Sequence, residues 1–156
     1  MEIWFYHLQR QSLEQALPTL IEKSLANGWR VVIQAKSEER LEALDHWLWT
    51  WSDASFLAHG RAADGDGELQ PVYLSTGVET PNGAKARVFV EGAEVAQWLE
   101  ASPSEAVACA RAIVAFDGND EGELAAARLQ WKQLKERGFE LAYWRQSETG
   151  RWEKQA

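Results

Sequence analysis

The sequence is poor in the residues that build covalent or metal-centred chemistry. It contains one cysteine, Cys109, so no internal disulfide can form, and this is typical of a reducing compartment. Cys109 stands in an apolar run, which favours a buried, inert thiol over a reactive one. The three histidines, His7, His46 and His59, lack metal-ligand spacing, and a single cysteine cannot complete a zinc site. We therefore expect no metal and no cofactor.

Long hydrophobic runs are also missing. No stretch approaches the roughly 18 apolar residues that a bilayer span needs, and the N-terminus lacks the basic-then-apolar order of a signal peptide. The 156 residues fit one domain, and the apolar fraction of 46% is that of an ordinary globular protein. The sequence predicts a single cytoplasmic domain over residues 1–156.

Glycine-rich phosphate loops are absent as well. The first strand-to-helix turn, His7 to Ser12, has no glycine, so its backbone cannot approach a pyrophosphate closely. Asp53, Ser55 and His59 resemble a catalytic triad only in composition, because no nucleophile-elbow glycines surround Ser55. We expect no catalytic residues.

Segment 117–122 resembles the start of a calcium loop. A calcium loop needs a bidentate glutamate at its twelfth position, where this chain has Arg128. The segment is better explained as a strand-to-helix turn with acids at the helix N-terminus.

The order of the elements indicates an α/β fold. Residues 3–8, 30–35, 71–74, 86–90, 111–116 and 139–145 have the composition of strands, and 55–59 of a short one. Helices are expected from the cap Ser12 to Asn27-Gly28, from the cap Ser37 through Leu41, Leu44, Leu48 and Trp51, and over 120–137. Residues 62–67 are expected to be a loop, and residues 93–100 stay undecided. This order predicts three layers, with a mixed, mostly parallel sheet and helices on both faces, Rossmann-like but without the glycine loop.

Charge is distributed unevenly along the chain. Residues 128–154 carry seven Lys or Arg against four acids, a net +3, whereas the rest of the chain is −11. On the helix over 120–137, the apolar stripe is Leu124, Ala127, Trp131 and Leu134, and a basic stripe of Arg128, Lys132 and Lys135 runs beside it. An ordinary solvated helix face explains this pattern, and so does a site for an acidic peptide with an apolar end.

The nine tryptophans favour a surface that contacts a partner. Trp49 points away from the apolar face of its helix, which favours a partner contact. The alternative is that Trp49 lies in the following loop and folds inward.

Several motifs, in order and spacing, resemble the chi subunit family of bacterial DNA polymerase III over essentially the whole chain. These are Phe5-Tyr6-His7-Leu8, Leu44-Asp45-x-x-Leu48-Trp49, Ser55-Phe56-Leu57-x-His59, Phe116 to Asp120, Ala127-Arg128-x-x-Trp131-Lys132, Gly138-Phe139 and Tyr143-Trp144-x-Gln146.

The resemblance implies a non-catalytic adaptor that binds the acidic, Phe-terminated tail of single-stranded-DNA-binding protein. It also implies the psi subunit of the clamp loader as a partner, or a repair helicase in some relatives. Arg128 would contact the tail's acids or carboxylate, with Trp131 and Lys132 beside it. Trp49 and Phe56 match aromatic positions near that pocket.

Three positions differ from a relative of this family. Leu124 replaces a lysine, and Asp117 replaces an apolar residue, which predicts a less basic site and weaker tail binding. Tyr143 replaces a small residue and either reshapes the pocket or packs on it. We expect a monomer with mostly indirect DNA contact. The alternatives are a nucleotide-dependent enzyme on an α/β scaffold and a purely structural subunit.

Overall fold

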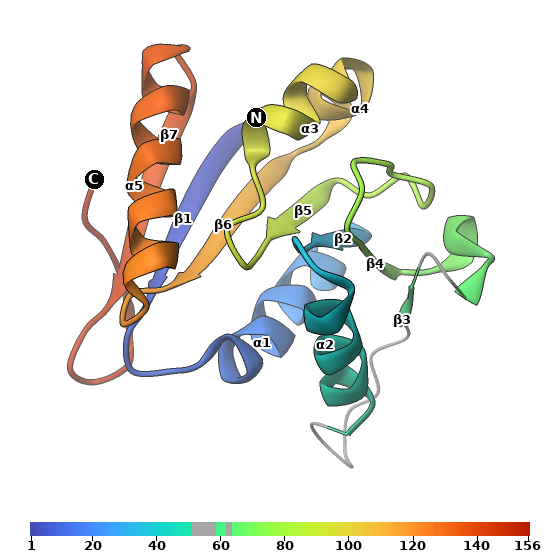
Figure 1. Cartoon of the computed structure of the whole chain (residues 1–156), viewed down its shortest axis with the longest axis horizontal. Helices are drawn as coiled ribbons and strands as arrows, with labels where there is room; N and C mark the ends of the chain where they lie inside the picture. The colour runs from blue at the N-terminus through green and yellow to red at the C-terminus, as the bar shows by residue number, and fades with distance from the viewer. Residues whose placement is uncertain (51–58, 62–63) are drawn as a thin grey trace.

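One eight-stranded sheet runs through the protein (Figure 1). The structure, a computed structural model, describes residues 1–50, 59–61 and 64–156. The strand order is β3-β4-β2-β5-β6-β1-β7-β8, and only the β7–β8 pairing is antiparallel among the described strands. The strands are β1 (Glu2–Leu8), β2 (Val31–Gln34), β3 (His59–Arg61), β4 (Val72–Ser75), β5 (Ala86–Phe89), β6 (Arg111–Asp117), β7 (Glu140–Gln146) and β8 (Trp152–Lys154). The mixed, mostly parallel sheet is confirmed.

Helices cover both faces of this sheet. They are α1 (Leu13–Ala26), α2 (Glu38–Thr50), α3 (Val95–Ala101), α4 (Pro103–Ala108) and α5 (Glu121–Glu136), with a short 3-10 helix, η2 (Gly67–Leu69). Helices α1 and α2 share one buried apolar cluster with the sheet, and α3, α4 and α5 share another. The three-layer α/β architecture is therefore confirmed.

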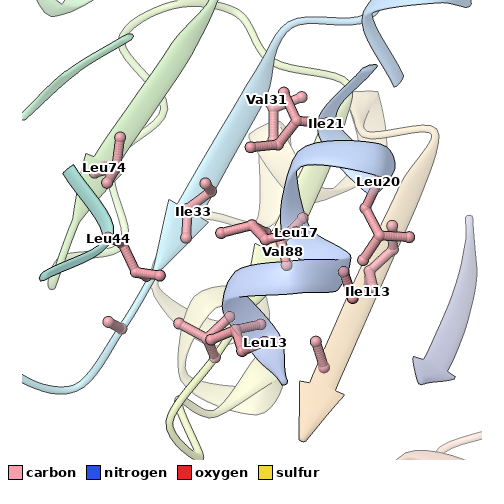
Figure 2. Close-up of a cluster of buried hydrophobic side chains, with 14 of the residues drawn as sticks. Leu13, Leu17, Leu20, Ile21, Val31, Ile33, Leu44, Leu74, Val88 and Ile113 are labelled. Atoms are coloured by element: carbon pink, nitrogen blue, oxygen red, sulfur yellow. The ribbon is translucent and has the colours of Figure 1, made fainter. Parts of the chain in front are cut away.

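The core under α1 is the larger of these two clusters (Figure 2). Leucines from α1 and Leu44 from α2 meet the branched residues of four strands. Because side chains of a strand alternate in direction, β1 supplies both layers. Tyr6 and Leu8 enter this core, whereas Ile3 and Phe5 enter the one under α5.

The helix starts follow the capping residues that the sequence indicated. Ser12 and Gln15 form a complete capping box at α1. The Ser37 hydroxyl oxygen accepts a hydrogen bond from the Arg40 backbone N–H at 3.2 Å, at the start of α2. The Asp120 carboxylate accepts one from the Glu123 N–H at 3.0 Å, which fixes the first turn of α5.

The structure resolves the undecided regions and adds one strand. Residues 93–100 contain most of α3, and α4 follows directly. No pattern in the sequence indicates β8, which pairs with β7 at the end of the sheet. Of the expected strand 55–59, only His59 is described, and β3 begins there. Of the expected loop 62–67, residues 64–67 are described, and η2 starts at Gly67.

Aromatic side chains from β1, β7 and β8 pack together on one face of the sheet. Trp4 and Trp144 have ring centroids 5.0 Å apart, and Tyr6 and Trp152 pack edge to face at 4.7 Å. The Arg111 guanidinium lies 3.7 Å from the Trp4 ring centroid, a cation–π distance. These half-buried rings shield the sheet face next to α1. Several of the nine tryptophans are therefore structural.

The helices of the described chain are too short or too polar to span a bilayer.

Candidate functional site

A hollow of about 450 Å³ opens between α5 and the strands β6 and β7. Phe116, Ala127, Arg128, Trp131, Tyr143 and Ala156 line it. The lining combines three aromatic rings with one guanidinium. This combination suits an anionic ligand that also carries an apolar group.

Helix α5 determines which of its side chains face the hollow. Ala127 and Leu134 are buried against the sheet, and Trp131 is half-buried between them. Arg128 follows Ala127 by one residue, about 100° around the helix, and is exposed. The helix therefore holds an indole at the edge of the core and a cation beside it.

The aromatic wall of the hollow is braced from two sides. Trp131 packs edge to face on Phe5, with centroids 5.3 Å apart, and on Tyr143, at 5.7 Å. Edge-to-face packing is a favourable geometry for aromatic pairs. The Trp131 ring is thus fixed before any ligand arrives.

The three cations of the basic stripe, Arg128, Lys132 and Lys135, are exposed and are not neutralised by ion pairs within the described part of the chain. Lys132 and Lys135 do not line the hollow and continue along α5 beyond it. The structure therefore brings together Arg128, Trp131 and Tyr143, with the two lysines outside.

A family model described as DNA polymerase III chi subunit, HolC, matches residues 1–142. The chain belongs to this family.

A relative from Rickettsia prowazekii (strain Madrid E), named "Probable DNA polymerase III subunit chi", is similar to part of the chain. The two are 30% identical over 95 residues, which are 61% of this chain and 58% of that relative. The match therefore covers less than two thirds of the relative's length. Membership places the chain in a family of accessory replication subunits.

The family match includes Arg128, Trp131 and Lys132 but ends before Tyr143. The matched region therefore supplies Phe116 and the three residues of α5 to the hollow, and the residues that follow it supply Tyr143 and Ala156. Tyr143 reaches the hollow because β7 pairs with β1 in parallel, which places it opposite Phe5.

Trp49, another aromatic residue of the predicted site, does not line this hollow. Trp49 lies in the last turn of α2, on the helix layer of the opposite sheet face, and is 53% exposed. Its ring centroid is 4.6 Å from that of His59. Phe56 lies outside the described residues.

Sequence reasoning missed His7 and Gly118 as parts of the site. His7 is buried, and its Nδ1 forms a hydrogen bond with the Tyr143 hydroxyl. Its ring also packs on Phe116, with centroids 5.0 Å apart. Burial lowers the pKa of His7, helped by the positive charges of Arg145 and Arg128. The sequence offered one signal, the histidine of the motif Phe5-Tyr6-His7-Leu8, but nothing in the motif indicates a contact with Tyr143.

A second place where backbone N–H groups bind an anionic group lies between β2 and α2. The Glu91 carboxylate accepts hydrogen bonds from the backbone N–H groups of Lys36 and Ser37, at 3.0 and 2.8 Å, and from the Ser37 hydroxyl. In nucleotide-binding α/β proteins a phosphate uses such backbone groups. Here the protein's own carboxylate occupies them.

The described residues form no metal site, and two members of the triad considered above lie outside them. Across residues 1–50, 59–61 and 64–156, no group of three or more His, Cys, Asp or Glu side chains could hold a metal ion. His59 Nε2 lies 2.8 Å from Asp45 Oδ1. Asp53 and Ser55 lie outside the described residues. Burial raises the pKa of the Cys109 thiol, as expected of an inert cysteine.

Proposed function

We propose that this chi-type protein is a non-catalytic replication adaptor in the cytoplasm. It links the clamp loader of DNA polymerase III to the acidic, Phe-terminated C-terminal tail of single-stranded-DNA-binding protein. The hollow beside α5 receives the end of the tail. The psi subunit, or a repair helicase, is a further proposed partner, and the isolated chain is proposed to be a monomer.

The observation that carries this proposal is an exposed, unpaired guanidinium at the mouth of an aromatic hollow. Arg128 has no carboxylate partner among the described residues, and the Trp131 and Tyr143 rings stand beside it. A Phe ring can enter the hollow while the adjacent carboxylate meets Arg128. An arginine can bind a carboxylate through two parallel N–H···O hydrogen bonds.

Lys132 and Lys135 act on the acidic residues that precede the terminal Phe. Because both lysines are exposed, their attraction is screened by salt. Tail affinity should therefore fall as ionic strength rises. The contacts that the resemblance implies at Trp49 and Phe56 remain predictions.

The test is a titration with a short acidic peptide that ends in Phe. Arg128→Ala removes a charge-assisted hydrogen bond, worth about 1.5–3 kcal/mol. We expect the Kd to rise about 10- to 100-fold.

Arg137→Ala is the matched control. It removes the same charge at the far end of α5, where Arg137 pairs with Glu100 at 2.8 Å, outside the hollow. This variant should bind like the wild type. Unchanged binding by Arg128→Ala would disprove the assigned site.

A further inference from the structure

Tyr143 lines the hollow, and the direction of its hydrogen bond to His7 decides what its hydroxyl can offer a ligand. His7 is only 6% exposed. A neutral imidazole carries one N–H, so either His7 Nδ1 or the Tyr143 hydroxyl is the donor. The position of the imidazole hydrogen is therefore the question to settle.

The surroundings of the other ring nitrogen favour one position for this hydrogen. His7 Nε2 is buried and has no hydrogen-bond partner among the described residues. A Cβ built on Gly118 would lie 1.9 Å from Nε2 and 2.2 Å from Cδ2, so the α-hydrogen in that direction crowds this edge of the ring, and an N–H at Nε2 would also be a buried donor without an acceptor among the described residues. An N–H there would set two hydrogens against each other. A bare lone pair instead accepts a weak Cα–H contact.

The imidazole hydrogen therefore resides on Nδ1 and is donated to the Tyr143 oxygen. The Tyr143 hydroxyl keeps its own hydrogen, for which the described residues provide no acceptor. Burial raises the pKa of Tyr143, against the opposing charges of Arg145 and Arg128. The hydroxyl thus stays protonated and able to donate at the wall of the hollow.

Arg128 is close enough to act on the same pair. Its positive charge lowers the pKa of both His7 and Tyr143, and it lines the hollow together with Tyr143. The hollow therefore has two donors of different kinds. A carboxylate has two acceptor oxygens and can satisfy both. A C-terminal amide has only one acceptor oxygen, so its NH₂ group would face either Arg128 or the Tyr143 hydroxyl, and both of these are donors.

We propose that Tyr143, oriented by His7, donates a second hydrogen bond to the terminal carboxylate that Arg128 receives, so that the hollow selects a free C-terminus beside an aromatic side chain. Tyr143 is the contacting residue and His7 is a positioning residue. This inference rests on the proposed function, because the same hollow and the same peptide are involved.

Two peptides that differ only at the C-terminus test the inference. One is the acidic peptide ending in Phe with a free carboxylate, and the other is its C-terminal amide. Tyr143→Phe keeps the ring and removes the hydroxyl. We expect it to weaken binding of the free acid about 10-fold, the loss of one hydrogen bond to a charged group, and to leave the amide unchanged.

His7→Phe should reduce the acid-to-amide preference in the same direction, because the hydroxyl loses its orienting donor. Tyr6→Phe is the matched control, since Tyr6 faces the opposite core and should leave both affinities unchanged. A Tyr143→Phe protein that binds the free acid like the wild type would overturn the inference. Arg128→Ala would still weaken binding in that case, so the proposed function would stand.

A nitrogen-15 NMR spectrum of the histidine rings tests the geometry without any ligand. We expect His7 to carry its hydrogen on Nδ1, with a bare Nε2. The opposite tautomer would overturn the inference even if a binding variant failed to fold.

Discussion

Replacing Gly118 with alanine tests the close contact between Gly118 and the His7 ring. The new methyl carbon would lie 1.9 Å from His7 Nε2 and 2.2 Å from Cδ2. Real side chains do not approach so closely, so the imidazole must move. Gly118 does not have a positive φ, so the cost of the substitution comes from this clash and not from backbone strain.

The size of the effect follows from how firmly His7 is held. Its ring is buried, packs on Phe116 and is bonded to Tyr143, so it has little room to turn away. Overpacking of a buried site costs about 1–3 kcal/mol, and we expect about 2–3 kcal/mol of lost unfolding free energy. For a domain of this size, the midpoint of thermal unfolding should fall by about 4–12 °C.

Thermal and urea unfolding of paired variants provide the assay. Gly122→Ala is the comparison: its Cβ would lie 3.3 Å from Asp120 Oδ1, so this capping carboxylate must shift by a few tenths of an ångström, while alanine favours the helix by about 1 kcal/mol, and we expect a smaller net change than for Gly118→Ala. Combining Gly118→Ala with His7→Ala should cost less than the sum of the two single changes, because the clash disappears. If Gly118→Ala unfolds like the wild type, the His7 contact and the tautomer argument built on it are refuted.

Two further changes have expected outcomes. Glu91→Ala leaves the backbone N–H groups of Lys36 and Ser37 without their carboxylate, and should lower the unfolding free energy by about 1.5–3 kcal/mol in urea titrations; a loss below the error of such titrations would contradict this role. The second concerns pH: because the folded-state pKa of His7 lies below its ordinary 6.5, the unfolded chain binds the proton first as pH falls. The contribution of His7 to stability is complete above about pH 6.5 and is lost progressively as pH falls toward the folded-state pKa. His7→Phe should lack this part of the pH dependence between pH 7 and 5, and an identical pH profile in the variant would exclude it.

Local patterns in the sequence predicted much of the α/β framework. The capping residues Ser12 and Ser37 act on neighbouring backbone groups, so they mark helix starts without knowledge of the fold. The periodicity of α5 likewise placed Ala127 and Leu134 in the core. Strand β8 was missed because a three-residue strand has too little pattern to recognise.

Contacts between distant segments limited the prediction of the site. His7 and Tyr143 are 136 positions apart and meet only because β1 pairs with β7. Similarly, the position of Trp49 in its helix predicts that it points away from the buried face of α2. It does not reveal that α2 and α5 cover opposite faces of the sheet. Topology decides both, and it is not a local property of the sequence.

Both outer strands of the sheet, β3 and β8, are only three residues long. An exposed strand edge offers unpaired backbone groups to other chains, and short edge strands limit that offer. Beyond β8, the backbone of Tyr143 still exchanges hydrogen bonds with Gln155 and Ala156, so the neighbouring long strand stays covered. A protein with nine tryptophans can therefore keep an aromatic hollow open at its surface while these short edges offer other copies of itself little free backbone for aggregation.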